Sequence, residues 1–487
     1  MNLFRDENVP IQTELEKLSQ QFQKVAGAMT VTFEGKEQTL PQMARYAEST
    51  DRDVREAAWR AVADRRLKDR ADIDAIFDQQ IALRHRMACN AGFPNYVGYA
   101  FKAHRRFDYT PEDCFRFHEA VERAVVPFMR RQDRKRKEQL NLAELRPWDL
   151  AVDPKGRPPL RPFTNGPDLV RKSLAVFRKL DPRLETMLAT LGDGTNTNGS
   201  AGGACLDLDS RKGKAPGGYQ YMRELSRKPF IFMNSAGLHR DVETMVHEAG
   251  HAFHSLLCVN EPLKPYRHAP IEFCEVASMS MELLTMPHWG HPDAFYPNPD
   301  DLARAQRRQL EGTLMLLPWI ATIDAFQHWL YTRPTHTQDQ RTDFWLQLDQ
   351  RFGHDVSWQG IEPARATQWQ RQGHLFGHPF YYIEYGIAQL GALQLWLTSL
   401  EKGVPHAIDL YLKSLSLGGT KPLPELFRAA GLTFDFSAST VQRLVDRVET
   451  ELAKLPRYNY DPGFSTGTIA VGGTLGILIP PSVILMV

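Results

Sequence analysis

The chain has 487 residues, of which 42% are hydrophobic and 24% are charged, a balance typical of a soluble globular protein. Lys and Arg number 59 against 58 for Asp and Glu, so the formal net charge is +1. This balance argues against nucleic acid as a partner, because binding it usually needs a basic excess. The length exceeds that of one ordinary core, and we expect two lobes or one large multi-helix domain.

The cysteine pattern and the N-terminus both favour a reducing compartment. The five cysteines are widely spaced and include no C-x-x-C pair: Cys89, Cys114, Cys205, Cys258 and Cys274. An odd, dispersed set does not predict a disulfide framework. The first ten residues, M-N-L-F-R-D-E-N-V-P, lack the apolar run of a secretory signal. The expected location is therefore the cytoplasm.

Helical periodicity dominates the first half of the chain. Apolar residues recur at helical spacing from Leu15 to Val25, and alternation around a glycine turn predicts a hairpin over 30–40. Further helices are expected over 53–89 and 111–139, and the proline-rich stretch 147–162 breaks the second of them. The N-terminal part is thus predicted to be a bundle of helices.

The middle of the chain changes character. Residues 192–218, which include G-T-N-T-N-G-S-A-G-G, are predicted to form a loop. Two strands are expected over 218–222 and 229–234, followed by a helix beyond Asp241. The coarse prediction is a mainly α body with a small sheet just before this helix.

The C-terminal segment differs from the rest. Residues 462–487 contain no charged side chain and are long enough to cross a bilayer. Glycines at 472, 473 and 476 and the pair Pro480–Pro481 make a continuous helix unfavourable. The sequence leaves open whether this tail contacts a membrane, whereas the charged main body is not expected to do so.

The pentad His247-Glu248-Ala249-Gly250-His251 is the most informative motif. Residues four apart share one face of a helix, so two neutral imidazoles can hold one cation while Glu248 lies beside it. An apolar stripe at helical spacing from Val242 to Leu257 supports the helix. Gly250 is unfavourable in a helix interior by about 1 kcal/mol, which suggests that a strand or another helix packs closely there.

A catalytic zinc ion usually takes three protein ligands and leaves one position open. Glu275 follows at a separation that allows a turn and a second helix to run back past the first. Glu272 and Glu282 are competing candidates, and composition does not choose among the three. Two imidazoles and a carboxylate make zinc the expected metal.

Longer blocks around the pentad carry a family resemblance. The pentad lies in T-M-V-H-E-A-G-H-A-F-H-S and is followed by E-F-C-E-V-A-S-M-S-M-E-L-L. Other blocks are D-R-D-V-R-E-A-A-W, R-R-F-D-Y-T-P-E-D, L-R-P-W-D-L, R-K-G-K-A-P-G-G-Y-Q-Y, P-F-I-F-M-N and G-H-P-F-Y-Y-I-E-Y-G-I-A-Q. Together they resemble the thimet oligopeptidase and oligoendopeptidase F family of zinc peptidases, over residues 3–457.

The resemblance implies a role for individual residues. It selects Glu275 as the third ligand of one zinc ion, beside His247 and His251, and makes Glu248 the general base. In the block R-Q-G-H-L-F-G-H-P-F-Y-Y-I-E-Y it implies that His374, Tyr382 and Tyr385 stabilise the tetrahedral intermediate, with His378 as an alternative to His374. Glu282, seven residues after Glu275, is expected to orient a ligand imidazole.

The resemblance also implies an activity and a shape. It predicts a cytoplasmic zinc metalloendopeptidase with a two-lobed helical body, a small β-sheet beside the H-E-x-x-H helix and a deep channel that admits short unstructured peptides. The expected regions are an N-terminal lobe over 1–190 that begins inside the family's first lobe, a catalytic region over 191–457 and the tail 458–487. An exopeptidase and a catalytically impaired zinc-binding remnant are the alternatives.

The tail departs from this family. The segment Y-N-Y-D-P-G-F-S-T-G-T-I-A-V-G-G-T-L-G-I-L-I-P-P-S-V-I-L resembles a stretch of the large permease subunit of TRAP-type transporters. No upstream block resembles a transporter. We therefore interpret 458–487 as a foreign segment joined near Pro456 to Tyr458.

Overall fold

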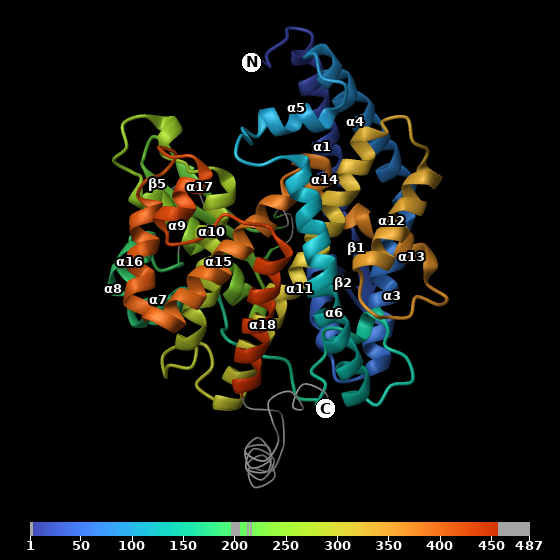
Figure 1. Cartoon of the computed structure of the whole chain (residues 1–487). Helices are drawn as coiled ribbons and strands as arrows, with labels where there is room; N and C mark the ends of the chain where they lie inside the picture. The colour runs from blue at the N-terminus through green and yellow to red at the C-terminus, as the bar shows by residue number, and fades with distance from the viewer. Residues whose placement is uncertain (1–2, 196–204, 212–213, 215–216, 456–487) are drawn as a thin grey trace, which may run out of the picture. The chain divides into compact units, whose positions relative to one another are not determined.

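The computed structural model describes residues 3–195, 205–211, 214 and 217–455, and these are mainly helical with a small sheet (Figure 1). This confirms the predicted fold class. The chain divides into two units, Met1–Val445 and Asp446–Val487. The expected region boundaries, the two lobes and the channel remain predictions, and the interpretation of the tail falls outside the described residues. None of the described helices is long and apolar enough to cross a membrane.

In the described part of the chain, eight α-helices precede the three-stranded sheet. They are α1 (Asn8–Gly27), α2 (Leu40–Met43), α3 (Arg52–Lys68), α4 (Arg70–Asn90), α5 (Tyr96–Ala103), α6 (Pro111–Gln139), α7 (Gly166–Leu180) and α8 (Pro182–Ala189). Ten follow it: α9 (His239–Leu257), α10 (Ile271–Thr285), α11 (Pro299–Thr332), α12 (Gln338–Phe352), α13 (Glu362–Ala366), α14 (Gly373–Gly377), α15 (Tyr382–Lys402), α16 (Val404–Leu415), α17 (Leu423–Ala429) and α18 (Ala438–Lys454).

The predictions for the first half hold with one exception. The hairpin is present as β1 (Thr30–Phe33) and β2 (Lys36–Thr39), and α6 has the predicted bounds. The single helix expected over 53–89 is wrong, because α3 and α4 meet at Asp69. The Asp69 backbone leaves helical geometry there, and its N–H bonds back to the carbonyl of Arg66 at 3.2 Å.

The small sheet has the order β3-β5-β4. The expected strands are β4 (Tyr219–Arg223) and β5 (Lys228–Ser235), which pair antiparallel, and burial alternates along β5. The predicted loop also contains β3 (Leu206–Asp209), which pairs parallel with β5. The loop assignment is therefore wrong for these four residues, because a short strand is stabilised by its partner rather than by local preference.

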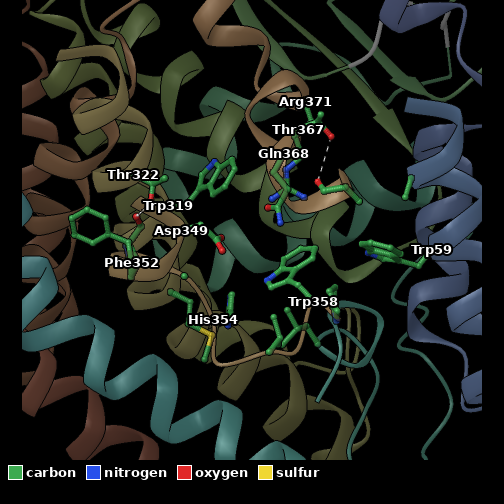
Figure 2. A pocket seen from close by; sticks show the side chains of 18 of the residues that line it. Trp59, Trp319, Thr322, Asp349, Phe352, His354, Trp358, Thr367, Gln368 and Arg371 are labelled. Atoms are coloured by element: carbon green, nitrogen blue, oxygen red, sulfur yellow. Dashed lines mark hydrogen bonds between the residues drawn. The ribbon is translucent and has the colours of Figure 1, made fainter. Parts of the chain in front are cut away.

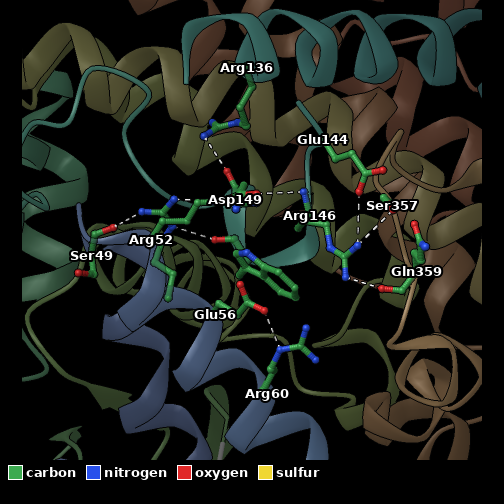
Figure 3. Close-up of polar contacts among 12 residues, drawn as sticks. Ser49, Arg52, Glu56, Arg60, Arg136, Glu144, Arg146, Asp149, Ser357 and Gln359 are labelled. Carbon is green, nitrogen blue, oxygen red and sulfur yellow. Dashed lines mark hydrogen bonds and ion pairs between the residues drawn. The ribbon is translucent and has the colours of Figure 1, made fainter. Parts of the chain in front are cut away.

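A corner between α3 and the turn Pro147–Asp149 ties two distant parts of the chain together (Figure 3). The Asp149 carboxylate is fully buried and accepts hydrogen bonds from Arg52 Nη2 at 2.9 Å and Arg55 Nη2 at 3.0 Å. It also accepts from the backbone N–H of Arg146 at 3.0 Å. Burial by itself raises the pKa of Asp149, but these hydrogen bonds outweigh it and lower the pKa below its ordinary value.

Replacing Asp149 by asparagine should lower the free energy of unfolding by about 2 kcal/mol, because the hydrogen bonds from Arg52 and Arg55 lose their charged acceptor. A depressed carboxyl pKa contributes stability that is present above about pH 4 and is lost as the pH falls further. The difference between wild type and variant should therefore shrink below about pH 4. Urea unfolding at several pH values measures it, and a pH-independent difference would contradict the charge argument.

Candidate metal and catalytic site

The pentad lies on α9, as predicted, with its two histidines one turn apart. The apolar side of this helix is buried, since Val242, Met245, Val246, Ala249 and Phe253 are all 0% exposed. The side chains of His247 and His251 lie beside this face and remain 19% and 17% exposed. Packing of the apolar stripe therefore fixes the direction in which both imidazoles point.

Helix α10 brings a carboxylate between the two imidazoles. Glu275 Oε2 lies 3.3 Å from His247 Nε2 and 3.4 Å from His251 Nε2. The Glu275 side chain is only 3% exposed, and Ser278 Oγ donates a hydrogen bond to the same oxygen at 3.0 Å. Burial by itself raises the pKa of Glu275, but the two histidines outweigh it and hold the pKa well below its usual range.

The donor set fits a metal cation. His247 Nδ1 lies 2.7 Å from Glu282 Oε1, and a carboxylate can only accept, so this nitrogen carries the proton. Burial by itself lowers the pKa of His247, but without a metal the carboxylates of Glu275 and Glu282 outweigh it and raise the pKa well above its ordinary value, so a proton lies between His247 Nε2 and Glu275 Oε2. A cation held by these two atoms and by His251 Nε2 would take the place of that proton. Two imidazoles and one carboxylate are the ligands that catalytic zinc takes in proteins.

The other two acidic residues of α10 have different surroundings. Glu282 accepts hydrogen bonds from His247 Nδ1 and from Gln309 Nε2, the latter at 3.1 Å. Such a contact can hold the His247 ring in one orientation. Glu272 instead accepts a hydrogen bond from Tyr109 at 2.7 Å and lies 3.9 Å from Arg106. Of the three candidate ligands, Glu275 is the one that faces both imidazoles.

Gly250 is the point where α9 and α10 come into contact. A methyl group built at Gly250 would lie 2.5 Å from the carbonyl oxygen of Ala277 and 2.6 Å from Ser278 Cα. The close packing suggested by this glycine is therefore with the helix that carries Glu275. Because the backbones meet here, the two histidines on α9 can reach a carboxylate on α10.

Glu248 has the surroundings of a proton acceptor rather than of a structural residue. It is 5% exposed, and within the described residues its Oε2 has no hydrogen-bond partner. Burial raises the pKa of Glu248, opposed by the charges of His251 and His247. A buried, unpaired carboxylate destabilises the fold, so its retention next to the imidazoles points to a chemical role.

A second group of candidate site residues lies on α14 and at the start of α15. The His374 ring lies 5.1 Å from that of Tyr382 and 5.8 Å from that of Tyr385, between ring centroids. Burial raises the pKa of Tyr385, and the nearby charges of Glu275 and Glu248 raise it further. Helices α10 and α15 pack against each other (Figure 1), and the charge of Glu275 acts on both His374 and Tyr385.

The two candidate histidines of this group differ in environment. Burial lowers the pKa of His374 to about 4, so its imidazole is neutral near neutrality, and Gln372 Nε2 lies 2.7 Å from its Nδ1. His378 is exposed, and its ring lies edge-on to that of Tyr381, with 6.2 Å between the ring centroids. His374 is therefore the histidine in contact with both predicted tyrosines.

Tyr381 was not among the predicted site residues. Its hydroxyl donates to Glu275 Oε1 at 2.8 Å, on the side of the carboxylate opposite the imidazoles. A signal was present in the sequence, since Tyr381 and Tyr385 are four residues apart and share a helix face.

Comparison with known proteins places the chain in a family. The model of peptidase family M3 matches residues 45–445. The chain belongs to peptidase family M3. Solved structures of peptidases resemble the chain over most of its length. The structure of PZ peptidase A is 29% identical, with a TM-score of 0.86, and the match covers 93% of this chain and 78% of that one. A putative oligoendopeptidase F from Bacillus anthracis str. Ames has 26% identity and a TM-score of 0.81, with 93% and 76% coverage.

Curated family M3 relatives match over a shorter range. Oligopeptidase PepF of Bacillus subtilis (strain 168) is 25% identical over 236 residues, which are 47% of this chain and 33% of the relative. Mitochondrial intermediate peptidase 2 of Cryptococcus neoformans var. neoformans (strain JEC21) is 27% identical over 191 residues, or 35% and 21%. The matched segment thus spans a third or less of these two relatives.

Proposed function

We propose that this chain is a zinc metalloendopeptidase that hydrolyses short unstructured oligopeptides. The observation that carries the proposal is the convergence of His247, His251 and Glu275, with the unpaired carboxylate of Glu248 beside them. Membership of family M3 supports a peptidase with this chemistry. One zinc ion per chain would be held by the three ligands, in the cytoplasm, with peptides as the partners.

The bound zinc would acidify the attacking water and polarise the scissile carbonyl. Glu248 accepts the proton of this water and passes it to the leaving amine. His374, Tyr382 and Tyr385 donate hydrogen bonds to the oxyanion, and removing one such donor costs about 3 kcal/mol in comparable sites. Glu282 keeps the His247 ring in the tautomer that leaves Nε2 free for the metal.

The test is cleavage of an internally quenched peptide of about eight residues with both ends blocked, with and without the chelator phenanthroline. We expect internal cleavage that the chelator abolishes and added zinc restores. Cleavage only of peptides with a free terminus would favour the exopeptidase alternative, and bound zinc without turnover would identify an impaired remnant.

A further inference from the structure

A large cavity lies next to the turn that precedes α14 (Figure 2). Its volume is about 330 Å³, and it lies between α3, α6, α11, α12 and the turn that precedes α14. The tryptophans Trp59, Trp319 and Trp358 and the guanidinium groups of Arg66 and Arg371 line it. Aromatic walls with a few charged groups are typical of ligand sites.

The charges in this cavity do not balance. Its carboxylate, Asp349, is bound by Arg365 Nε at 2.6 Å, and Arg365 is not among the lining residues. Within the described residues, Arg66 and Arg371 form no ion pair, and Arg371 lies over the Trp319 ring at 4.6 Å. Burial and mutual repulsion lower the pKa of Arg66 to about 10, so Arg66 stays charged at neutral pH. Burial also lowers the pKa of Arg371, opposed by Tyr382 and Asp349.

Two guanidinium groups without an ion pair of their own among the described residues, set in a concave site, attract an anion, since the low-dielectric walls focus their field. Arg371 is exposed to solvent and Arg66 is half-buried, so an anion can reach both groups. Guanidinium groups bind carboxylates with two parallel hydrogen bonds, which makes a carboxylate the best-fitting anion.

The cavity is connected to the reacting groups through two hydrogen bonds. Trp319 Nε1 in its wall donates to Gln372 Oε1 at 3.0 Å, and Gln372 Nε2 lies 2.7 Å from His374 Nδ1. Arg371 is adjacent to Gln372 in the chain, and its charge acts on Tyr382. The cavity and the proposed peptide-binding region thus share a wall that contains Trp319 and Gln372.

We propose that this cavity is a subsite that binds a carboxylate of the peptide substrate through Arg66 and Arg371, while its tryptophans contact apolar side chains. The inference rests on the proposed peptidase function. The carboxylate can be the C-terminus of the peptide or an acidic side chain. Short peptides with a free C-terminus would then be preferred over internal segments of long chains.

The test uses two pairs of quenched peptides that the wild-type protein cleaves. In the first pair, one peptide ends in a free carboxylate and the other in an amide. In the second pair, both peptides end in an amide, and they differ only by Glu or Gln at one internal position. We expect kcat/KM to be about tenfold higher for the carboxylate member of at least one pair, because one charge-assisted contact contributes about this factor. The pair that shows the preference identifies the source of the carboxylate.

In Arg66→Gln, the ratio of kcat/KM between the carboxylate peptide and its partner should fall toward one. In Arg86→Gln, which removes an exposed charge on α4, this ratio should stay as in wild type. A structural defect would lower both members of a pair equally, so the ratio isolates the contact. Arg371→Gln serves as a second variant if Arg66→Gln does not fold. No preference in wild type, or an unchanged ratio in both variants, would overturn the subsite.

Failure of the proposed function gives a different result. If wild-type protein cleaves no peptide, calorimetric titration with the acid and amide peptides still measures the subsite. Tighter binding of the acid, lost in Arg66→Gln and kept in Arg86→Gln, would support it without turnover. Equal binding of both peptides would overturn it.

Discussion

Replacing Glu248 by glutamine is expected to lower kcat by about three orders of magnitude while the protein keeps its metal. Glutamine has the same shape but cannot accept a proton from the attacking water. Glu248 lies between the proposed ligands His247 and His251 in sequence and makes no hydrogen bond to Glu275 within the described residues, so the three proposed ligand atoms should stay in place. The measurement is single-substrate kinetics on the quenched peptide, together with metal content by atomic absorption.

A matched control is Glu16→Gln, which removes an exposed carboxylate from α1 and should leave kcat within a factor of two. Turnover of Glu248→Gln within tenfold of wild type, at equal metal content, would show that another group accepts the proton. Loss of the metal from this variant would instead make Glu248 part of the binding site.

Replacing Gly250 by alanine is expected to destabilise the fold by about 3 kcal/mol and to weaken metal binding at the same time. The new methyl group would overlap the backbone of Ala277 and Ser278, and backbone atoms cannot rotate away as a side-chain end can. Helices α9 and α10 would have to separate, which moves Glu275 away from the two imidazoles. Chemical denaturation and zinc titration of the apo-protein measure the two effects.

Gly312→Ala is the control for this prediction. Gly312 lies in α11 with no atom within 4 Å of an added methyl, so alanine should stabilise the protein by about 0.5–1 kcal/mol through its higher helix propensity. If Gly250→Ala is also neutral or stabilising, the close approach of α9 and α10 is not required for the fold or the site.

Local patterns account for what could be predicted about the site. The H-E-x-x-H helix, the hairpin and α6 all follow from spacing and capping signals that lie within a few turns of one another. A helix places His247, Glu248 and His251 whatever the rest of the chain does, because the i and i+4 positions share a face. The mainly α class follows in the same way, from many such local signals.

Contacts between distant segments account for what the sequence left open. Three acidic residues of α10 were candidate ligands, and the packing of α10 against Gly250 on one side and Tyr109 on the other separates their surroundings. Strand β3 exists because β5 supplies its partner, which no four-residue pattern reveals.

The same reason applies to Tyr381 and to the cavity. Tyr381 joins the site because α15 packs on α10, which brings its hydroxyl to Glu275. Arg66 and Arg371 lie far apart in the sequence and meet only when α3 and the turn before α14 fold around one space. Helix periodicity places side chains on a face, whereas the partner that this face meets depends on the folded arrangement of the whole chain.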